Sequence, residues 1–221
     1  ALHARAQALQ LKGTVLLAEE GINLFLAGPP SAVWQWLAEL QADVRFAALD
    51  IKESWSAELP FARLKVKVKR EIIRMNQPQL KPQHGRAAAV DAPTLARWLQ
   101  AGHDDAGRPL VMLDARNSFE VDAGAFDHAL DWRLHKFSDF PAALQAHAAE
   151  LKDRTVVAYC TGGIRCEKAV LAMHESGIDH AYQLDGGILR YLERLPGAPH
   201  WHGRCFVFDE RETVGTELEP A

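Results

Sequence analysis

The first third of the chain has the hydrophobic pattern of a small α+β domain. Between the second and third of four strand-like runs, apolar residues recur at i, i+3 and i+4 spacing, which predicts a helix with Ser31 as its N-terminal cap. Helices packed on one face of an antiparallel sheet accommodate this order. The strand-like runs are Thr14–Ala18, Ile22–Ala27, Val44–Ile51 and Leu64–Val68.

The second half of the chain alternates strand and helix patterns. Such alternation predicts an α/β domain with a central parallel sheet, whose ligands bind beyond the carboxyl ends of the strands. The expected strands are Leu110–Asp114, Thr155–Tyr159 and His180–Leu184. The expected helices are Asp91–Gln100, Asp139–Leu151, Cys166–Ser176 and Gly187–Leu195.

Two unlike domains are therefore expected. A polar, proline-containing stretch at Asn76–Arg86 is unsuited to continuing a helix or a strand, so it is interpreted as part of a linker. We assign residues 1–76 to the first domain, 77–90 to the linker, 91–198 to the second domain and 199–221 to a C-terminal extension. Helical spacing from the first residue onward indicates that the first domain is truncated at its start.

Composition excludes several classes of protein. The 221 residues are 48% hydrophobic with a formal net charge of −4, and no apolar stretch approaches the roughly 20 residues that span a bilayer. The first residues lack the pattern of a signal peptide. Three cysteines are too few for the disulfide framework of a small secreted protein. We expect a soluble cytoplasmic protein with free thiols and no membrane partner.

Charge is concentrated in one segment. Phe61–Arg86 contains eight basic residues and one acidic residue, a local charge of +7. In its strand-like part, Leu64, Val66 and Val68 alternate with lysines, which places the lysines together on one face. Lysines there can protect an edge strand from aggregation or contact a phosphate backbone, and both interpretations stay open. The candidate RNA-binding residues are Arg63, Lys65, Lys67, Lys69, Arg70 and Arg74.

The strongest candidate for chemistry is the cysteine that follows the strand Thr155–Tyr159. A lone cysteine at a strand end is more often a small buried residue, but Cys160 is followed by a glycine pair, Arg165 and a helix. The glycines let backbone amides turn inward, and the helix adds its positive end, so the loop should lower the pKa of Cys160. The loop residues are Thr161, Gly162, Gly163, Ile164 and Cys166.

Two residues of this loop have open roles. Arg165 can contact an anion held at the sulfur or can clamp the loop to its neighbours. Cys166 can act as a resolving thiol or form a disulfide with Cys160, although packing of its helix is the favoured interpretation. We expect Cys160 and Arg165 to be the catalytic residues, with Cys160 able to attack a sulfur donor and carry a persulfide.

The spacing CxxxxR between a strand and a helix resembles the active loop of rhodanese sulfurtransferases. The stretch LDARNSFEVDAGAFDHAL at Leu113–Leu130 and the motif LDGGILRYL at Leu184–Leu192 are also similar to rhodanese motifs in the expected order. The resemblance covers about 100 residues and predicts a rhodanese domain. It implies a supporting role for Asp114 and Arg116, as a buried ion pair or hydrogen-bonding frame beside the loop.

Nearly the whole chain resembles the bacterial family of rhodanese-domain tRNA uridine hydroxylases. The stretches LKGTVLLAEEGIN and KESWSAELPFARLKVKVKREII extend the similarity into the first domain, which we expect to be ferredoxin-like. The resemblance implies a tRNA partner and oxygen-dependent hydroxylation of the wobble uridine to 5-hydroxyuridine, with molecular oxygen as co-substrate and no other evident cofactor. Many relatives continue into a tail with CxxC pairs, whereas the last part of this sequence contains only Cys205. A metal site formed by such a tail is therefore not expected here.

Other functions and sites compete with this interpretation. The Cys160 loop alone fits a sulfurtransferase with a small-molecule or protein sulfur donor, and the basic segment alone fits a non-catalytic RNA-binding module. Cysteine phosphatases have one more residue in the loop, which disfavours them. The residues Glu19 and Glu20 fit either an ordinary hairpin turn or the hydroxylation site. A metal site is disfavoured at the remaining candidates, which are His200, His202 and Cys205.

Overall fold

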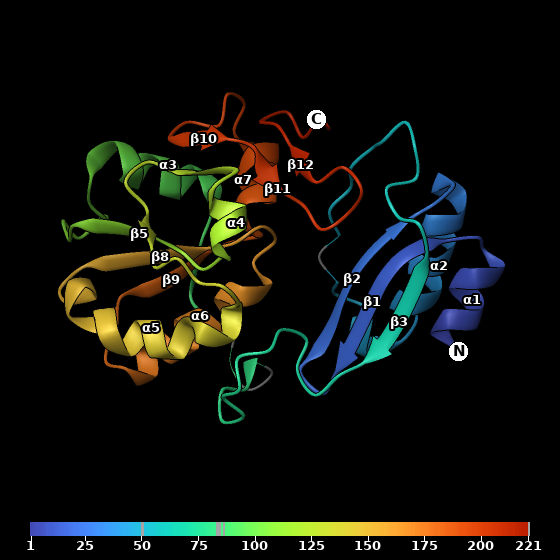
Figure 1. Ribbon diagram of the computed structural model, residues 1–221, viewed down its shortest axis with the longest axis horizontal. Coiled ribbons are helices and arrows are strands. Elements are labelled where there is room, and N and C mark those ends of the chain that lie inside the picture. Colours follow the sequence, from blue (N-terminus) through green and yellow to red (C-terminus); the bar gives the residue numbers. More distant parts are fainter. Residues whose placement is uncertain (50, 83–84, 86, 221) are drawn as a thin grey trace. The chain divides into compact units, whose positions relative to one another are not determined.

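The computed structural model describes residues 1–49, 51–82, 85 and 87–220, which fall into two compact units (Figure 1). The first unit comprises Ala1–Ile72 together with Phe208–Arg211. The second comprises Ile73–Val207 and the described residues from Glu212 onward. No described helix combines the length and the apolar character that crossing a bilayer requires.

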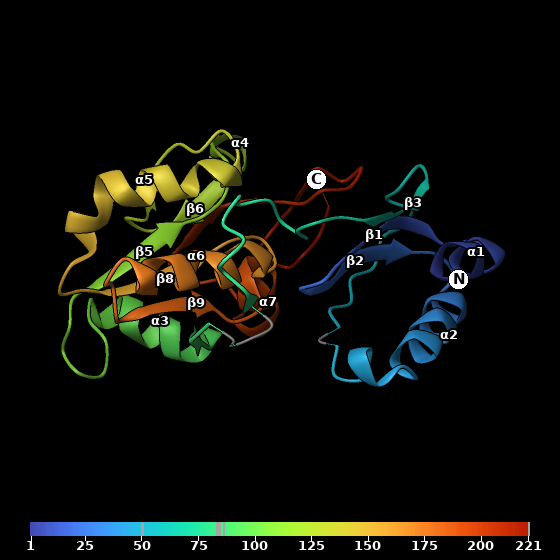
Figure 2. The same ribbon diagram turned by 90° about the horizontal axis from the view of Figure 1, so that it is seen from below.

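The first unit is a three-stranded sheet with helices on one face (Figure 2). The strand order is β2-β1-β3, with β1 antiparallel to β2 and parallel to β3. Its core joins Val15 of β1 to Trp36, Leu37 and Leu40 of α2. The elements are α1 (Leu2–Ala8), β1 (Lys12–Ala18), β2 (Gly21–Ala27), α2 (Pro30–Gln41), a 3₁₀ helix (Val44–Phe46) and β3 (Leu64–Val68).

Two local predictions for this unit are wrong. Where the strand Val44–Ile51 is expected, the described residues form no strand and begin with the short 3₁₀ helix, because the Asp43 side chain accepts a hydrogen bond from the Arg45 N–H and caps that turn. Residue 50 of this range lies outside the described residues. The helix expected to be capped by Ser31 begins at Pro30 instead, since proline is preorganised for the first helical turn.

Two predictions for the sheet also need correction. The sheet is not wholly antiparallel, because β3 runs parallel to β1. Leu64 and Val66 pack against the core as expected, whereas Val68 is 83% exposed. Val68 is the last residue of a strand at the edge of the sheet, where fewer neighbours can cover a side chain.

The second unit contains a five-stranded sheet in the order β4-β9-β8-β5-β7, in which neighbouring strands are parallel. The strands are β4 (Ala89–Val90), β5 (Leu110–Asp114), β7 (Leu130–Asp131), β8 (Thr155–Tyr159) and β9 (Ala181–Leu184). Strands β5 and β8 match their predicted ranges residue for residue. All five residues of β8 are buried, as expected for a strand covered on both faces.

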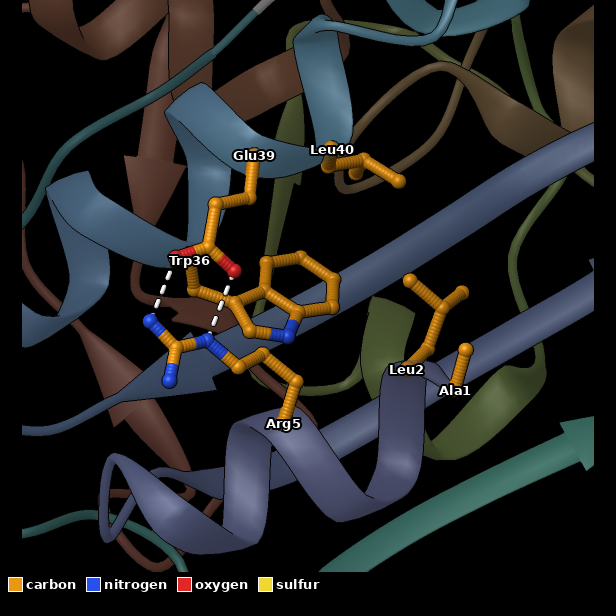
Figure 3. Close-up of a pocket in the computed structure, with 6 residues that line it drawn as sticks. All are labelled: Ala1, Leu2, Arg5, Trp36, Glu39 and Leu40. Atoms are coloured by element: carbon orange, nitrogen blue, oxygen red, sulfur yellow. Dashed lines mark hydrogen bonds and ion pairs between the residues drawn. The ribbon is translucent and has the colours of Figure 1, made fainter.

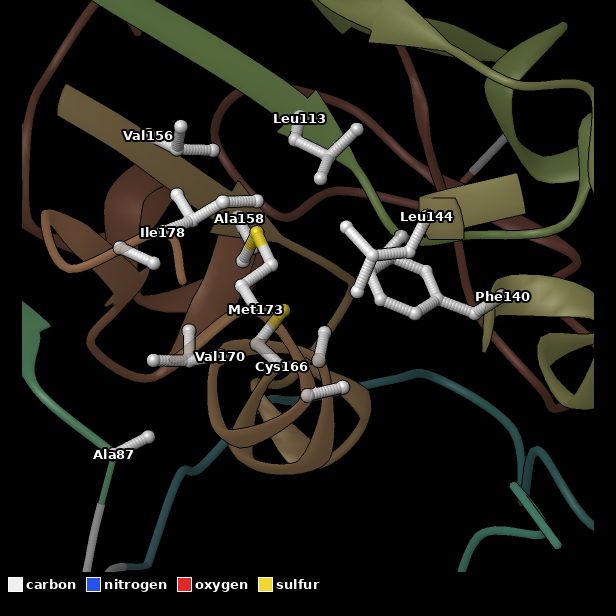
Figure 4. Packing of buried hydrophobic residues seen from close by; sticks show 14 of the residues in the cluster. Ala87, Leu113, Phe140, Leu144, Val156, Ala158, Cys166, Val170, Met173 and Ile178 are labelled. Carbon is white, nitrogen blue, oxygen red and sulfur yellow. The ribbon is translucent and has the colours of Figure 1, made fainter. Parts of the chain in front are cut away.

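Helices cover both faces of this sheet. One core cluster joins α5 and α6 to the sheet, with Leu113, Ala158 and Met173 fully buried (Figure 4). The opposite cluster joins α3 and α7 to it. The helices are α3 (Ala92–Ala101), α4 (Ser118–Val121), α5 (Phe140–His147), α6 (Ile164–Glu175) and α7 (Gly187–Arg194), with 3₁₀ turns at Phe137–Asp139 and Ala148–Leu151.

The predicted linker and extension contribute to the packed structure. Within 77–90, Leu80 and Ala87 are buried in the core of the second unit, and β4 pairs with β9. Within 199–221, one strand pairs with β6 and two others pair with each other. These elements are β6 (Gly124–Phe126), β10 (Trp201–Gly203), β11 (Cys205–Phe206) and β12 (Thr213–Val214).

Candidate active site

Cys160 lies where a parallel sheet presents its ligands. It follows β8, a central strand of the sheet, and the chain then turns directly into α6. The turn depends on Gly163, which has a positive φ of 94° at the helix cap. The Gly163 N–H donates a hydrogen bond to the Cys160 sulfur over 3.2 Å. The loop therefore directs backbone donors at the sulfur, as its sequence predicts.

The last helix holds this loop from the other side. Ile188 N–H donates to the Cys160 carbonyl oxygen over 3.0 Å, and Leu189 N–H donates to the Thr161 carbonyl oxygen over 3.1 Å. Gly187 has a positive φ of 68°, and an added Cβ there would lie 2.4 Å from the Cys160 carbonyl oxygen. Gly187, the first residue of α7, is therefore needed for the close approach of this helix to the loop.

The surroundings of Cys160 favour its thiolate. Complete burial by itself raises the pKa of this thiol, but the Cys166 thiol, the Arg165 charge and the N–H groups of Arg165 and Gly163 lower it to about 5. Burial and the neighbouring Cys160 raise the pKa of Cys166 well above its usual range. Cys166 therefore remains protonated and donates a hydrogen bond to the Cys160 thiolate. Both are free thiols in this structure.

Arg165 is held by a buried carboxylate. Its guanidinium forms two hydrogen bonds with Glu120, over 2.5 Å and 2.7 Å, and both side chains are at most 5% exposed. Burial opposes the charge of Arg165, but these bonds and the Cys160 thiolate raise its pKa. The Thr161 hydroxyl lies 3.3 Å from the same carboxylate. Arg165 thus clamps the loop to α4 while its charge stabilises the sulfur anion.

Asp114 and Arg116 form a second buried ion pair beside this clamp. Their shortest N–O distance is 2.6 Å and neither side chain is exposed. Arg116 also donates to the carbonyl oxygens of Glu120 and Gly124, over 3.1 Å and 2.6 Å. Its guanidinium lies 5.5 Å from the centre of the Trp201 ring, a cation–π distance. The pair therefore supports the segment that carries Glu120.

The sequence does not single out Glu120 as a residue of the site, nor does it show that Cys205 is a buried thiol nearby. Glu120 could have been found from its spacing to Asn117, whose N–H donates to Glu120 over 3.1 Å in the manner of a capping box. Cys205, which the sequence offers only as a disfavoured metal candidate, is fully buried, and burial raises its pKa to about 12. No local signal places β11 beside the loop, where the Thr161 hydroxyl lies 3.3 Å from the Phe206 carbonyl oxygen.

The other candidate residues lie apart from this site. His200 Nδ1 lies 3.1 Å from an Asp127 oxygen, and His202 contacts the other oxygen of the same carboxylate. Within the described ranges, no three residues among His, Cys, Asp and Glu are grouped so as to hold a metal. Glu20 accepts a hydrogen bond from Ile72 N–H over 2.5 Å, which gives this turn residue a structural role.

The basic candidates are divided between the two units. Lys65 and Lys67 lie on β3, Arg63 precedes it, and Lys69 and Arg70 follow it. Arg74 belongs to the second unit, where its side chain donates to Asn76 over 2.8 Å. Strand β3 is at an edge of its sheet, so both interpretations of its lysines remain predictions.

A pocket in the first unit lies between α1 and α2. The Arg5–Glu39 ion pair closes one side of it, with a nitrogen–oxygen distance of 2.5 Å. No cysteine, serine or threonine is among its lining residues. Its lining residues are Ala1, Leu2, Arg5, Trp36, Glu39 and Leu40 (Figure 3).

The first prediction concerns the titration of Cys160. The thiolate is measured by its ultraviolet absorbance, as the difference between the wild type and Cys160→Ser. As the pH is raised, this absorbance should increase with a midpoint near pH 5. Cys166→Ala removes one donor to the charged sulfur and should move the midpoint up by roughly one to two pH units. A midpoint that Cys166→Ala leaves unchanged would refute the proposed hydrogen bond.

The second prediction concerns the buried clamp. Glu120→Gln leaves the Arg165 charge buried without its counterion and should lower the free energy of unfolding by about 3 kcal/mol. Urea unfolding measures this change. Glu39→Gln is the control, because it alters an ion pair whose side chains are 41% and 43% exposed and should hardly move the midpoint. Equal small effects of both substitutions would contradict the prediction.

Comparison with known proteins agrees with this architecture. Two family models match the chain, the UPF0176 acylphosphatase-like domain over residues 1–72 and the rhodanese-like domain over residues 95–194. They confirm the predicted fold class, an α+β domain followed by a rhodanese domain. A solved human single-domain sulfurtransferase is 26% identical, with a TM-score of 0.41, over 49% of this chain and 98% of its own.

Two relatives match almost the entire chain. The tRNA uridine(34) hydroxylase of Delftia acidovorans is 61% identical over 217 residues, which are 98% of this chain and 82% of the relative. That of Bordetella avium is 57% identical over 220 residues, which are 100% of this chain and 90% of the relative. At this identity and coverage, the chain belongs to the tRNA uridine(34) hydroxylase family.

Proposed function

We propose that the protein hydroxylates uridine 34, the wobble uridine of tRNA. The carrying observation is the 61% identity over 98% of the chain to a relative named for this activity. We further propose that the product is 5-hydroxyuridine and that molecular oxygen is the co-substrate. A tRNA substrate implies that the protein works in the cytoplasm.

The geometry around Cys160 supports a chemical role for the second unit in this activity. A thiolate with a pKa of about 5 is fully formed at neutral pH and is a strong nucleophile. The residues that stabilise it are fixed by backbone hydrogen bonds and by the Arg165–Glu120 pair, so little reorganisation is needed when charge changes at the sulfur. Cys160 is accordingly the residue on which the proposed activity depends.

A nucleoside profile tests the substrate and the residue together. We expect tRNA from a deletion strain to lack 5-hydroxyuridine and its derivatives, the wild-type gene to restore them under aerobic conditions only, and Cys160→Ala to fail. Cys205→Ala is the matched control, because it removes a thiol that stays protonated. An unchanged profile in the deletion strain would refute the hydroxylase. Full restoration by Cys160→Ala would instead favour a non-catalytic role for the loop.

Sulfur transfer is a second candidate, and the lowered pKa of Cys160 specifically favours it. The thiolate would attack the outer sulfur of thiosulfate, the sulfur–sulfur bond would break, and sulfite would leave with the bonding electron pair. The resulting persulfide anion would be stabilised by the Gly163 N–H and the Arg165 charge. An acceptor such as cyanide would then take the terminal sulfur and regenerate the thiolate. A protein persulfide can replace thiosulfate as the donor.

Thiocyanate formation from thiosulfate and cyanide tests this candidate. We expect the wild-type protein to form thiocyanate and Cys160→Ser to form none above the uncatalysed rate, because a serine hydroxyl is not ionised at neutral pH. Cys205→Ala should retain the activity. A wild-type protein that forms no thiocyanate, and takes no sulfur from a protein persulfide, would eliminate sulfur transfer while leaving the hydroxylase untouched.

A further inference from the structure

The sheet of the first unit has one face that its helices do not cover. Strand register defines this open face, because residues paired side by side across a sheet point to the same side. Thr14 of β1 pairs with Phe25 of β2 and with Lys65 of β3, and Leu16 pairs with Asn23 and Lys67. The open face therefore consists of four rows of paired residues, which are Lys12–Ala27, Thr14–Phe25–Lys65, Leu16–Asn23–Lys67 and Ala18–Gly21.

The intervening residues point to the helices. Val15 pairs with Leu24 and with Val66, and all three contribute to the core beneath α1 and α2. The strand residues that form the hydrophobic core of this unit thus lie on one side of the sheet. The side chains of the open face do not belong to this core, and Phe25 among them is 42% exposed.

The open face combines an aromatic ring with three lysines, Lys12, Lys65 and Lys67. Phe25 and Lys65 occupy one row of three paired residues, which places them about 10 Å apart across the sheet. Lys67 lies two residues along β3 on the same side. Aromatic rings on a sheet surface stack unpaired bases, and neighbouring lysines neutralise phosphates.

We propose that the open face binds a single-stranded segment of tRNA, with one base stacked on Phe25 and adjacent phosphates contacting Lys65 and Lys67. The choice of RNA as partner rests on the proposed function and on charge complementarity between RNA phosphates and the lysines of this face. The anticodon loop is the single-stranded part of tRNA that carries uridine 34, so we assign this face to that loop.

Protection of an edge strand from aggregation explains fewer features of this face than RNA binding does. It explains lysines on β3, which is at one edge, but not a half-exposed phenylalanine on β2 at the opposite edge. An exposed apolar ring on an edge strand increases the risk of aggregation rather than lowering it. Base stacking explains the ring and the lysines together.

The test measures binding of the full-length protein to an anticodon stem-loop RNA with uridine at the wobble position. Phe25→Ala should weaken binding between about fivefold and 150-fold with an unchanged salt slope, and Phe25→Tyr should restore it. Lys65→Ala and Lys67→Ala should each lower the salt slope by about 0.7 to 0.9. Trp34→Ala is the matched control, since Trp34 is 45% exposed on α2, in the helical layer.

A duplex RNA of equal length without a loop separates the two kinds of contact. The lysine variants should weaken its binding, whereas Phe25→Ala should not, because paired bases are not available for stacking. Equal stem-loop affinity of Phe25→Ala and wild type would overturn the proposed surface, even if the wild type hydroxylates tRNA. Binding that depends on Phe25, in a protein that forms no hydroxylated uridine, would instead refute only the proposed function.

Discussion

A charged sulfur stays inside a protein only when fixed donors replace the water that it has lost. At Cys160 these donors are backbone N–H groups, the Cys166 thiol and the Arg165 charge. Arg165 is itself buried and therefore requires Glu120, and the Glu120 segment is held in turn by Arg116. Each buried charge therefore requires a further buried partner. The resulting series of contacts begins at the reactive loop and ends where Arg116 lies against Trp201 of β10.

The parts of the fold that were predicted correctly are those set by local patterns. Strands β5 and β8 are short apolar runs at the centre of a parallel sheet. Because such strands are buried on both faces, their residues are almost all apolar, and the change to polar residues marks where each strand ends. The expected strand at Val44–Ile51 failed because a single capping residue, Asp43, redirects the backbone. In the stretch interpreted as a linker, polar composition does not reveal where isolated apolar residues such as Leu80 pack.

The candidate site shows the same division. Cys160, its glycines and Arg165 are contiguous, so their chemistry follows from spacing alone. Glu120 lies 45 residues before Arg165, and nothing in either segment by itself indicates that the two side chains meet. Cys166 was interpreted as a packing residue, and its hydrogen bond to the thiolate depends on burial that spacing does not disclose. The contact of Glu120 with Arg165 and the burial of Cys205 follow only from the tertiary structure.

The close contact between Gly187 and the Cys160 loop couples chemical reactivity to the completion of folding. The carbonyl groups of Cys160 and Thr161 are bound by α7, a helix made of residues that a ribosome synthesises after the loop. The loop that faces its N–H groups toward the sulfur therefore takes its final shape only when a helix from later in the chain is in place.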